Sequence, residues 1–73
     1  MFYVTIKDGS RTSLALGPFE THEEALEAES RVREYVLKEY DLKGAWFWAY
    51  GTSRLKEGPY PQGKLNSILQ NSN

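Results

Sequence analysis

The sequence predicts an α+β domain in which one amphipathic helix packs on one face of a three-stranded antiparallel sheet. Three features support this prediction: two short alternating segments near the N-terminus, a capped helical repeat after them, and an aromatic run at residues 45–50. The elements follow the order strand, strand, helix, strand, a ββαβ chain. A return through the helix places the third strand antiparallel to the first, so we expect the sheet order 2-1-3 with the first strand central.

The first two strands form a predicted hairpin. Residues 2–7 alternate apolar with polar or aromatic side chains, and this period of two is typical of a strand with one buried face. Asp8 and Gly9 then supply a turn, because glycine accepts positive φ. Residues 11–16 alternate more weakly and are expected to form the second strand.

The helix is expected to follow a break in the chain. The segment 17–19 should end the second strand, because Pro18 has no N–H to donate to a ladder. Thr21 and Glu24 have the spacing of a capping box, in which each side chain bonds the backbone of the other. Apolar residues then recur at spacings of three and four from residue 22 to about residue 40, which predicts an amphipathic helix of about five turns.

The third predicted strand, residues 45–50, carries both tryptophans of the chain. Alternation sends Ala45, Phe47 and Ala49 to one face and the larger aromatic residues to the other. Small residues suit the closest approach of a helix to a sheet, so we expect the alanine face beneath the helix. The residues then expected on the opposite, open face of the sheet are Tyr3, Trp46, Trp48 and Tyr50.

This open face has two interpretations. Pro59, Tyr60 or the aliphatic residues that follow can fold over it and exclude water, since large exposed apolar patches are uncommon on monomers. Alternatively, the aromatic residues form a contact patch for a partner, because tryptophan and tyrosine dominate interface hot spots. The glycines and prolines beyond residue 50 favour a folded domain at 1–50 and a mobile tail at 51–73.

Composition excludes several classes of protein. The 73 residues include no cysteine and one histidine, which excludes disulfides, thiolate zinc sites and His-rich metal clusters. No apolar stretch approaches the length of a membrane span, and the N-terminus lacks the pattern of a signal peptide. No titratable residues form a catalytic motif, so we expect neither an enzyme nor a cofactor.

Charge is unevenly distributed, although the net charge is −1. Residues 20–29 hold five acidic residues and no basic one, whereas residues 43–64 hold four basic residues and one acidic one. Such runs are typical of solvated surfaces, and they also fit two partner-facing surfaces of opposite sign. Besides the four aromatic residues of the open face, the candidates for partner contact are Glu24, Glu27, Arg54 and Lys56.

A resemblance rests on the start MFYVTIKDG, the turn and capped helix GPFETHEEA, and the strand AWFWAYGTSRL. With these segments, the whole chain resembles the small RNA polymerase-binding transcription regulators of lytic Xanthomonas bacteriophages. The resemblance implies a non-enzymatic protein of the host bacterial cytoplasm that binds the N-terminal part of the largest polymerase subunit. It also implies promotion of sigma-factor loss at initiation and antitermination during elongation. We expect a monomer, with Arg54 and Lys56 near polymerase or nascent RNA or DNA.

Two alternatives come from other features. Residues 2–32 resemble one half of a sporulation-related repeat, a cell-wall glycan-binding domain in which a strand leads through GPF to a helix. That class is exported and has a second half-repeat, and the sequence shows neither. Exposed aromatic residues on a sheet beside lysine and arginine would also suit a single-stranded nucleic-acid binder.

Overall fold

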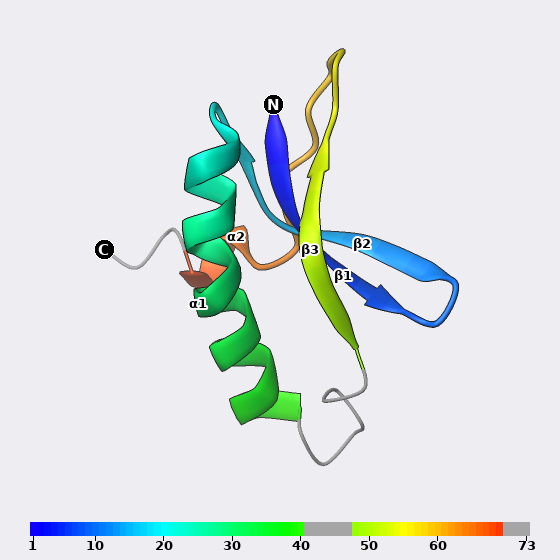
Figure 1. The fold of residues 1–73 in the computed structure, drawn as a ribbon, viewed down its shortest axis with the longest axis vertical. Helices are drawn as coiled ribbons and strands as arrows, with labels where there is room; N and C mark the ends of the chain where they lie inside the picture. Colours follow the sequence, from blue (N-terminus) through cyan, green and yellow to red (C-terminus); the bar gives the residue numbers. More distant parts are fainter. Residues whose placement is uncertain (41–47, 70–73) are drawn as a thin grey trace.

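The structure, a computed structural model, describes residues 1–40 and 48–69. Its elements in chain order are β1 (Phe2–Asp8), β2 (Arg11–Phe19), α1 (His22–Tyr40), β3 (Ala49–Arg54) and α2 (Asn66–Leu69), as Figure 1 shows. The strands form one antiparallel sheet in the order β2-β1-β3. The predicted α+β class, the ββαβ order and the sheet order are confirmed.

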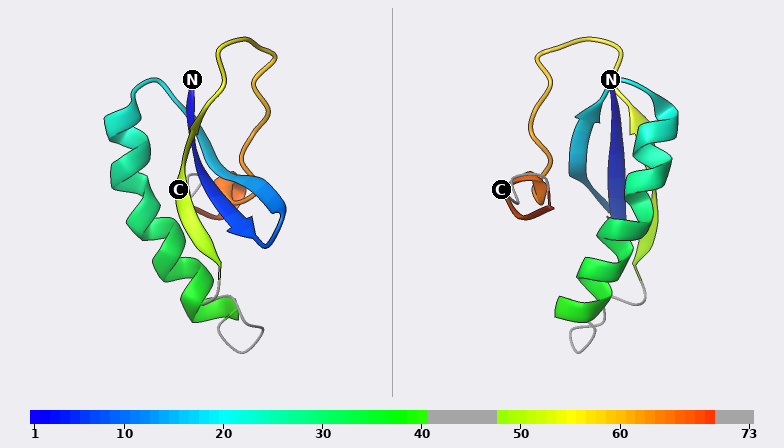
Figure 2. Two further views of the ribbon diagram at one scale, coloured as in Figure 1. Left: turned by 45° about the vertical axis from the view of Figure 1, so that its right-hand side comes forward. Right: turned by 90° about the vertical axis from the view of Figure 1, so that its left-hand side faces the viewer.

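The core lies between α1 and the face of the sheet that it covers. Val4 of the central strand pairs with Leu16 of β2, and paired residues share a face. Figure 2 shows α1 lying across this face, while the chain beyond β3 loops away to the far side of β2, where α2 lies. The buried core cluster consists of Val4, Ala15, Leu16, Ala28, Val32 and Val36.

The start of α1 is fixed by the predicted capping box. The Thr21 hydroxyl accepts a hydrogen bond from the backbone N–H of Glu24 at 3.1 Å, and the Glu24 carboxylate accepts one from the backbone N–H of Thr21 at 3.1 Å. These bonds satisfy backbone donors that have no partner within the helix. The helix then runs over the predicted residues 22–40.

The predicted end of the second strand at residue 16 is wrong, because β2 continues through Pro18 to Phe19. A proline is tolerated on an edge strand, where its missing N–H removes no bond to a central strand, and β2 is at the edge of the sheet. Gly17 has a φ of 137°, and a Cβ there would lie 2.7 Å from the ring of Tyr3. The pairing of β2 with β1 is also irregular near this residue, with register shifts between Phe2 and Val4 and between Val4 and Thr5.

The predicted boundary after residue 50 is also wrong, because it falls inside β3, which extends to Arg54. The ladder continues one pair further: the N-terminal amino group of Met1 donates to the Leu55 carbonyl at 3.0 Å, and the Leu55 N–H donates to the Met1 carbonyl at 2.9 Å. Residues 45–47 of the predicted strand lie outside the described residues.

Residues 63–66 pack along the outer edge of β2. The N–H groups of Gly63, Lys64 and Leu65 donate to the carbonyls of Gly17, Leu14 and Ala15 at 3.1, 2.9 and 2.7 Å. Asn66 is buried, and its side-chain oxygen accepts from the Gly17 N–H at 2.9 Å. The folded domain therefore includes this segment.

Candidate partner-binding surface

Tyr3 lies on the open face but is not available to a partner. Its side chain is 0% exposed, and its hydroxyl donates to the Pro61 carbonyl at 2.7 Å. The segment after β3 therefore covers the open face at this position, which is the first of the two interpretations given above. The prediction that Tyr3 forms an apolar contact with a partner is wrong.

The buried Tyr3 makes stability sensitive to alkaline pH. Burial raises the pKa of the Tyr3 hydroxyl above its usual value of about 10, and nearby Tyr60 raises it further. Between the two pKa values the unfolded chain has lost this proton and the folded chain keeps it. The Tyr3 contribution to the free energy of unfolding is therefore complete below about pH 10 and is lost as pH rises through the folded pKa.

Tyr3→Phe is expected to lower the free energy of unfolding by about 1 kcal/mol at neutral pH, because the hydrogen bond to Pro61 is lost. It should also weaken the alkaline decline, as measured by urea denaturation near neutral pH and above about pH 10. At neutral pH the control is Tyr60→Phe, since the Tyr60 hydroxyl makes an exposed 3.3 Å bond to the Lys56 carbonyl. An alkaline decline in Tyr3→Phe equal to that of the wild type would contradict this assignment.

Tyr50 and Trp48 lie on the helix side of the sheet, so the predicted face is wrong. Tyr50 pairs with Ile6, and both it and Trp48 pack against the core. Ala49 is exposed instead. The physical reason is area: an aromatic side chain buries far more apolar surface beneath a helix than alanine does. The predicted contact Trp46, with Ala45 and Phe47, lies outside the described residues.

Arg33 of α1 packs over the aromatic ring of Tyr50. The guanidinium carbon of Arg33 lies 5.5 Å from the Tyr50 ring centroid, and Arg33 also forms a 2.9 Å ion pair with Glu29. The Tyr50 hydroxyl is buried and has no hydrogen-bond partner among the described residues. Burial raises the pKa of Tyr50, and the charge of Arg33 opposes that rise. The hydroxyl therefore stays neutral at physiological pH.

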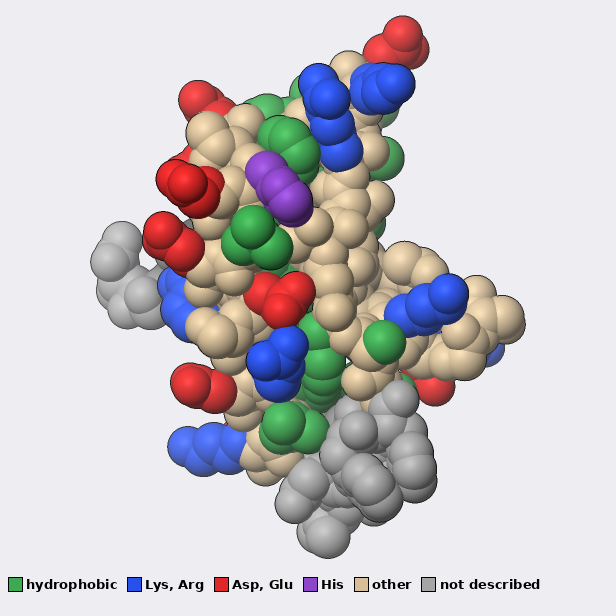
Figure 3. All heavy atoms as spheres, in the orientation of Figure 1, with side chains coloured by type: hydrophobic (Ala, Val, Ile, Leu, Met, Phe, Trp, Pro, Cys, Tyr) green, Lys and Arg blue, Asp and Glu red, His purple; other side chains and the backbone are tan. Residues whose placement is uncertain are grey.

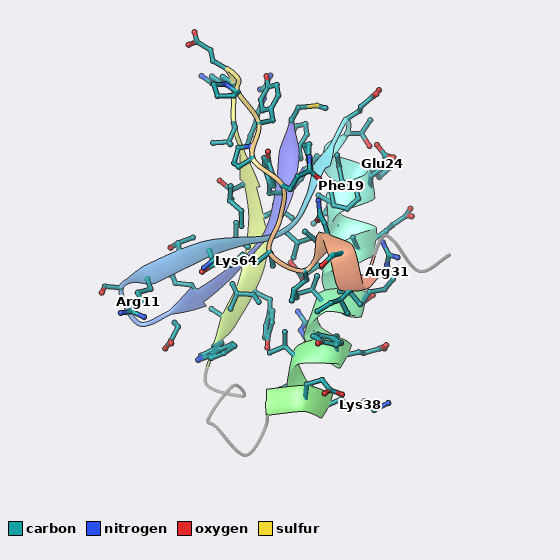
Figure 4. The ribbon with its side chains drawn as sticks, turned by 180° about the vertical axis from the view of Figure 1, so that it is seen from behind. Arg11, Phe19, Glu24, Arg31, Lys38 and Lys64 are labelled. Carbon is teal, nitrogen blue, oxygen red and sulfur yellow. The ribbon has the colours of Figure 1, made fainter. Side chains whose placement is uncertain are left out.

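Of the two predicted acidic contacts, Glu24 has a structural role in the capping box and Glu27 is exposed on α1. Figure 4 shows Glu24 with Arg31 and Lys38 on the flank of α1 nearest α2. This flank is distinct from the one that carries Arg33 over β3. The predicted contact residues that the structure describes do not form one patch.

The predicted basic contacts, Arg54 and Lys56, are both exposed at the end of β3. The guanidinium carbon of Arg54 lies 5.6 Å from the Phe2 ring, which stacks on His22 with centroids 5.4 Å apart. The His22 ring nitrogen lies 2.9 Å from the Thr52 hydroxyl oxygen. No local sequence signal indicates a role for Phe2 or His22, because the strand pairing that brings them beside Arg54 joins residues distant in the chain.

A cavity of about 300 Å³ lies between the β1–β2 hairpin, α1 and the segment after residue 63. Figure 4 shows Arg11 at the hairpin turn and Lys64 over β2. The Lys64 amino group lies 3.5 Å from the Ser13 hydroxyl. Both apolar and charged side chains line the cavity; the lining residues are Ile6, Asp8, Arg11, Ser13, Ala15, Val36, Trp48, Lys64 and Leu65.

The described part of the chain contains no cluster of three or more His, Cys, Asp or Glu side chains placed to hold a metal ion. No helix within residues 1–40 and 48–69 is long and apolar enough to cross a membrane. The described residues offer backbone hydrogen-bonding groups at β3, exposed charges and a small cavity. Comparisons of the chain with protein-family models, with curated proteins and with solved structures find no match.

Proposed function

We propose that this protein is a phage-encoded transcription regulator that binds the RNA polymerase of its bacterial host. It contacts the N-terminal part of the largest subunit, promotes loss of the sigma factor at initiation, and acts as an antiterminator during elongation. The identity of the partner rests on the whole-chain resemblance of the sequence. The structure supports the more general part of the proposal, which is binding to another protein.

The observation that supports protein binding is the face formed by α1 and β3. Figure 3 shows acidic side chains along the helix and basic side chains near the upper end of β3 on this face. Arg54 and Lys56 are exposed, and neither has a carboxylate partner among the described residues. Exposed charges of both signs favour rapid and specific encounter with a partner of complementary charge.

The alternatives receive less support. A single-stranded nucleic-acid binder needs exposed aromatic residues on which bases stack. Tyr3 is buried, and Tyr50 and Trp48 pack on the helix side, so the described open face offers no such set. No observation of the structure favours a glycan-binding module.

Purified bacterial RNA polymerase tests the proposal. The full chain is expected to co-elute with core enzyme in size-exclusion chromatography, to reduce promoter-dependent transcription when added with sigma factor, and to increase read-through of a terminator. Sedimentation with peptidoglycan and binding to a single-stranded oligonucleotide are measured in parallel. Binding to either of these, with no binding to polymerase at low salt, would contradict the proposal.

A further inference from the structure

The sheet has two edges, and the chain itself covers one of them. The outer edge of β2 accepts the three backbone hydrogen bonds from Gly63, Lys64 and Leu65. The other edge is β3, because the strand order is β2-β1-β3. No described segment pairs with the outer side of β3. In Figure 1 this strand lies at the front of the molecule.

The hydrogen-bond pattern identifies the free groups of β3. Met1 and Leu55 exchange both of their backbone hydrogen bonds, and the register from there to Lys7 and Ala49 is continuous. In an antiparallel ladder, such pairs alternate with pairs whose N–H and C=O groups point away from each other. The residues of β3 that direct their backbone N–H and C=O groups outward are therefore Tyr50, Thr52 and Arg54.

We propose that a segment of the partner adds to β3 as a fourth strand of the sheet. The three outward N–H and C=O groups form a hydrogen-bonding row of the kind that accepts an extended peptide. On the open face, β3 carries only the small side chains of Ala49, Gly51 and Ser53, which do not obstruct a neighbouring strand. The naming of polymerase as the source of this segment rests on the proposed function; the mode of addition rests on the geometry.

The flank of α1 beside β3 defines the chemistry of the segment. His22 lies against Thr52, and Leu26, one turn further along the same flank, is 50% exposed. Arg54 and Lys56 add positive charge at the end of the strand. Alternate side chains of an added strand would face this flank. The segment is therefore an extended peptide with an apolar residue facing Leu26 and an acidic residue facing Arg54.

A second copy of this chain fits the edge less well. In a symmetric antiparallel pair centred on Thr52, Arg54 of one copy would lie opposite Tyr50 of the other. Arg33 already lies 5.5 Å from the Tyr50 ring centroid. The pairing would thus place Arg54 beside an arginine whose carboxylate partner, Glu29, is already engaged, so Arg54 gains no free acidic partner at either end. Protection of the β3 amides that grows with protein concentration, without polymerase, would overturn the assignment to a partner segment.

Amide hydrogen exchange with purified core polymerase as the probe tests the inference. In the free chain, the amides of Tyr50, Thr52 and Arg54 should exchange rapidly, while those of Gly51 and Ser53 are protected by β1. In the complex, the first three should slow at least about tenfold. A complex without this slowing would overturn strand addition alone. Absence of any complex would overturn the proposed function together with this partner.

Two matched pairs of variants add an independent test. Thr52→Pro removes one outward N–H that makes no bond within the sheet, whereas Thr52→Val keeps it; both lose the contact with His22. Binding to polymerase should fall about tenfold or more in the first relative to the second. Arg54→Glu should weaken binding, and Lys38→Glu, the same charge change on the other flank of α1, should not. Equal binding within both pairs would overturn the proposal, and the second pair decides if Thr52→Pro does not fold.

Discussion

Replacing Gly63 with alanine is expected to remove most of the stability of the domain. A Cβ on Gly63 would lie 2.6 Å from both the Cα and the N of Leu16 and 2.7 Å from the carbonyl carbon of Ala15. These are backbone atoms of β2, and they cannot rotate away as a side chain can. The segment 63–66 must therefore move off the edge of β2.

The expected cost follows from the bonds that this movement breaks. The three backbone hydrogen bonds of the segment are lost, together with those between Asn66 and Gly17. At about 1 kcal/mol each, the loss reaches about 3 kcal/mol or more. A domain of this size has a total stability of roughly 3 to 5 kcal/mol. Urea denaturation followed by circular dichroism measures the change.

Gly51→Ala is the matched control for Gly63→Ala. A Cβ on Gly51 would find its nearest neighbour, the Thr5 hydroxyl oxygen, at 3.7 Å, which is an ordinary contact. We expect this variant to stay within about 0.5 kcal/mol of the wild type. A wild-type unfolding midpoint for Gly63→Ala would contradict the packing of residues 63–66 against β2.

The parts of the fold that the sequence predicts correctly depend on local signals. The strand β1, the turn at Gly9 and the capping box of α1 each follow from signals within a few residues, and all three are confirmed. The expectation that β1 buries only one face is wrong, because Tyr3 and Thr5 on the other face are also buried. The sheet order then follows from short connections and from the handedness of the return through the helix. These signals need no knowledge of distant contacts.

The orientation of β3 could not be predicted in the same way. Alternation divides the strand into two faces but does not say which one meets α1. Pairing with β1 decides it: Tyr50 lies opposite Ile6 and Thr52 lies opposite Val4, so both face the helix. The prediction that alanines of this strand face the helix is wrong because Trp48 and Tyr50 bury a larger apolar area there.

Local signals also could not predict that the segment after β3 covers Tyr3 and the outer edge of β2. Residues 58–63 have no hydrophobic periodicity, only glycines and prolines typical of a loop. Their packing depends on contacts such as Tyr3 to Pro61 and Gly17 to Asn66, which join residues more than 45 positions apart. The candidate site depended on this result. Arg54 was predicted as a contact, but β3 is recognised as the edge that no described segment pairs with only once β2 is seen to be covered.

Asn66→Asp is expected to have an effect as large as that of Gly63→Ala. The Asn66 side chain accepts from the Gly17 N–H at 2.9 Å and donates to both the Gly17 carbonyl and, at 2.7 Å, the Gln62 side-chain oxygen. A carboxylate keeps the acceptor but turns the donor into an oxygen facing two oxygens, and it buries a charge. We expect a loss of about 3 kcal/mol near neutral pH, measured by urea denaturation.

The pH dependence of this loss identifies its cause. Burial and the facing oxygens disfavour the charged form, so the introduced carboxyl has a folded pKa above its unfolded value of about 3.9. Its neutral form is therefore tolerated below the unfolded pKa, and stability is lost as pH rises through the folded pKa. Asn66→Ala is the control, with a loss that does not follow this titration. An equal difference from the wild type for both variants at acidic and neutral pH would contradict the role of charge.

The Asn66→Asp variant also tests why the chain covers β2. Release of residues 63–66 would free the backbone of Leu14, Ala15 and Gly17 while β3 stays open, giving the sheet two open edges. Open edges pair with other chains, so the variant should associate in a concentration-dependent way at neutral pH, as measured by sedimentation velocity. The wild type, with β2 covered, should remain monomeric under the same conditions. A variant that stays monomeric although its Leu65 amide has lost protection would contradict this role of the segment that covers β2.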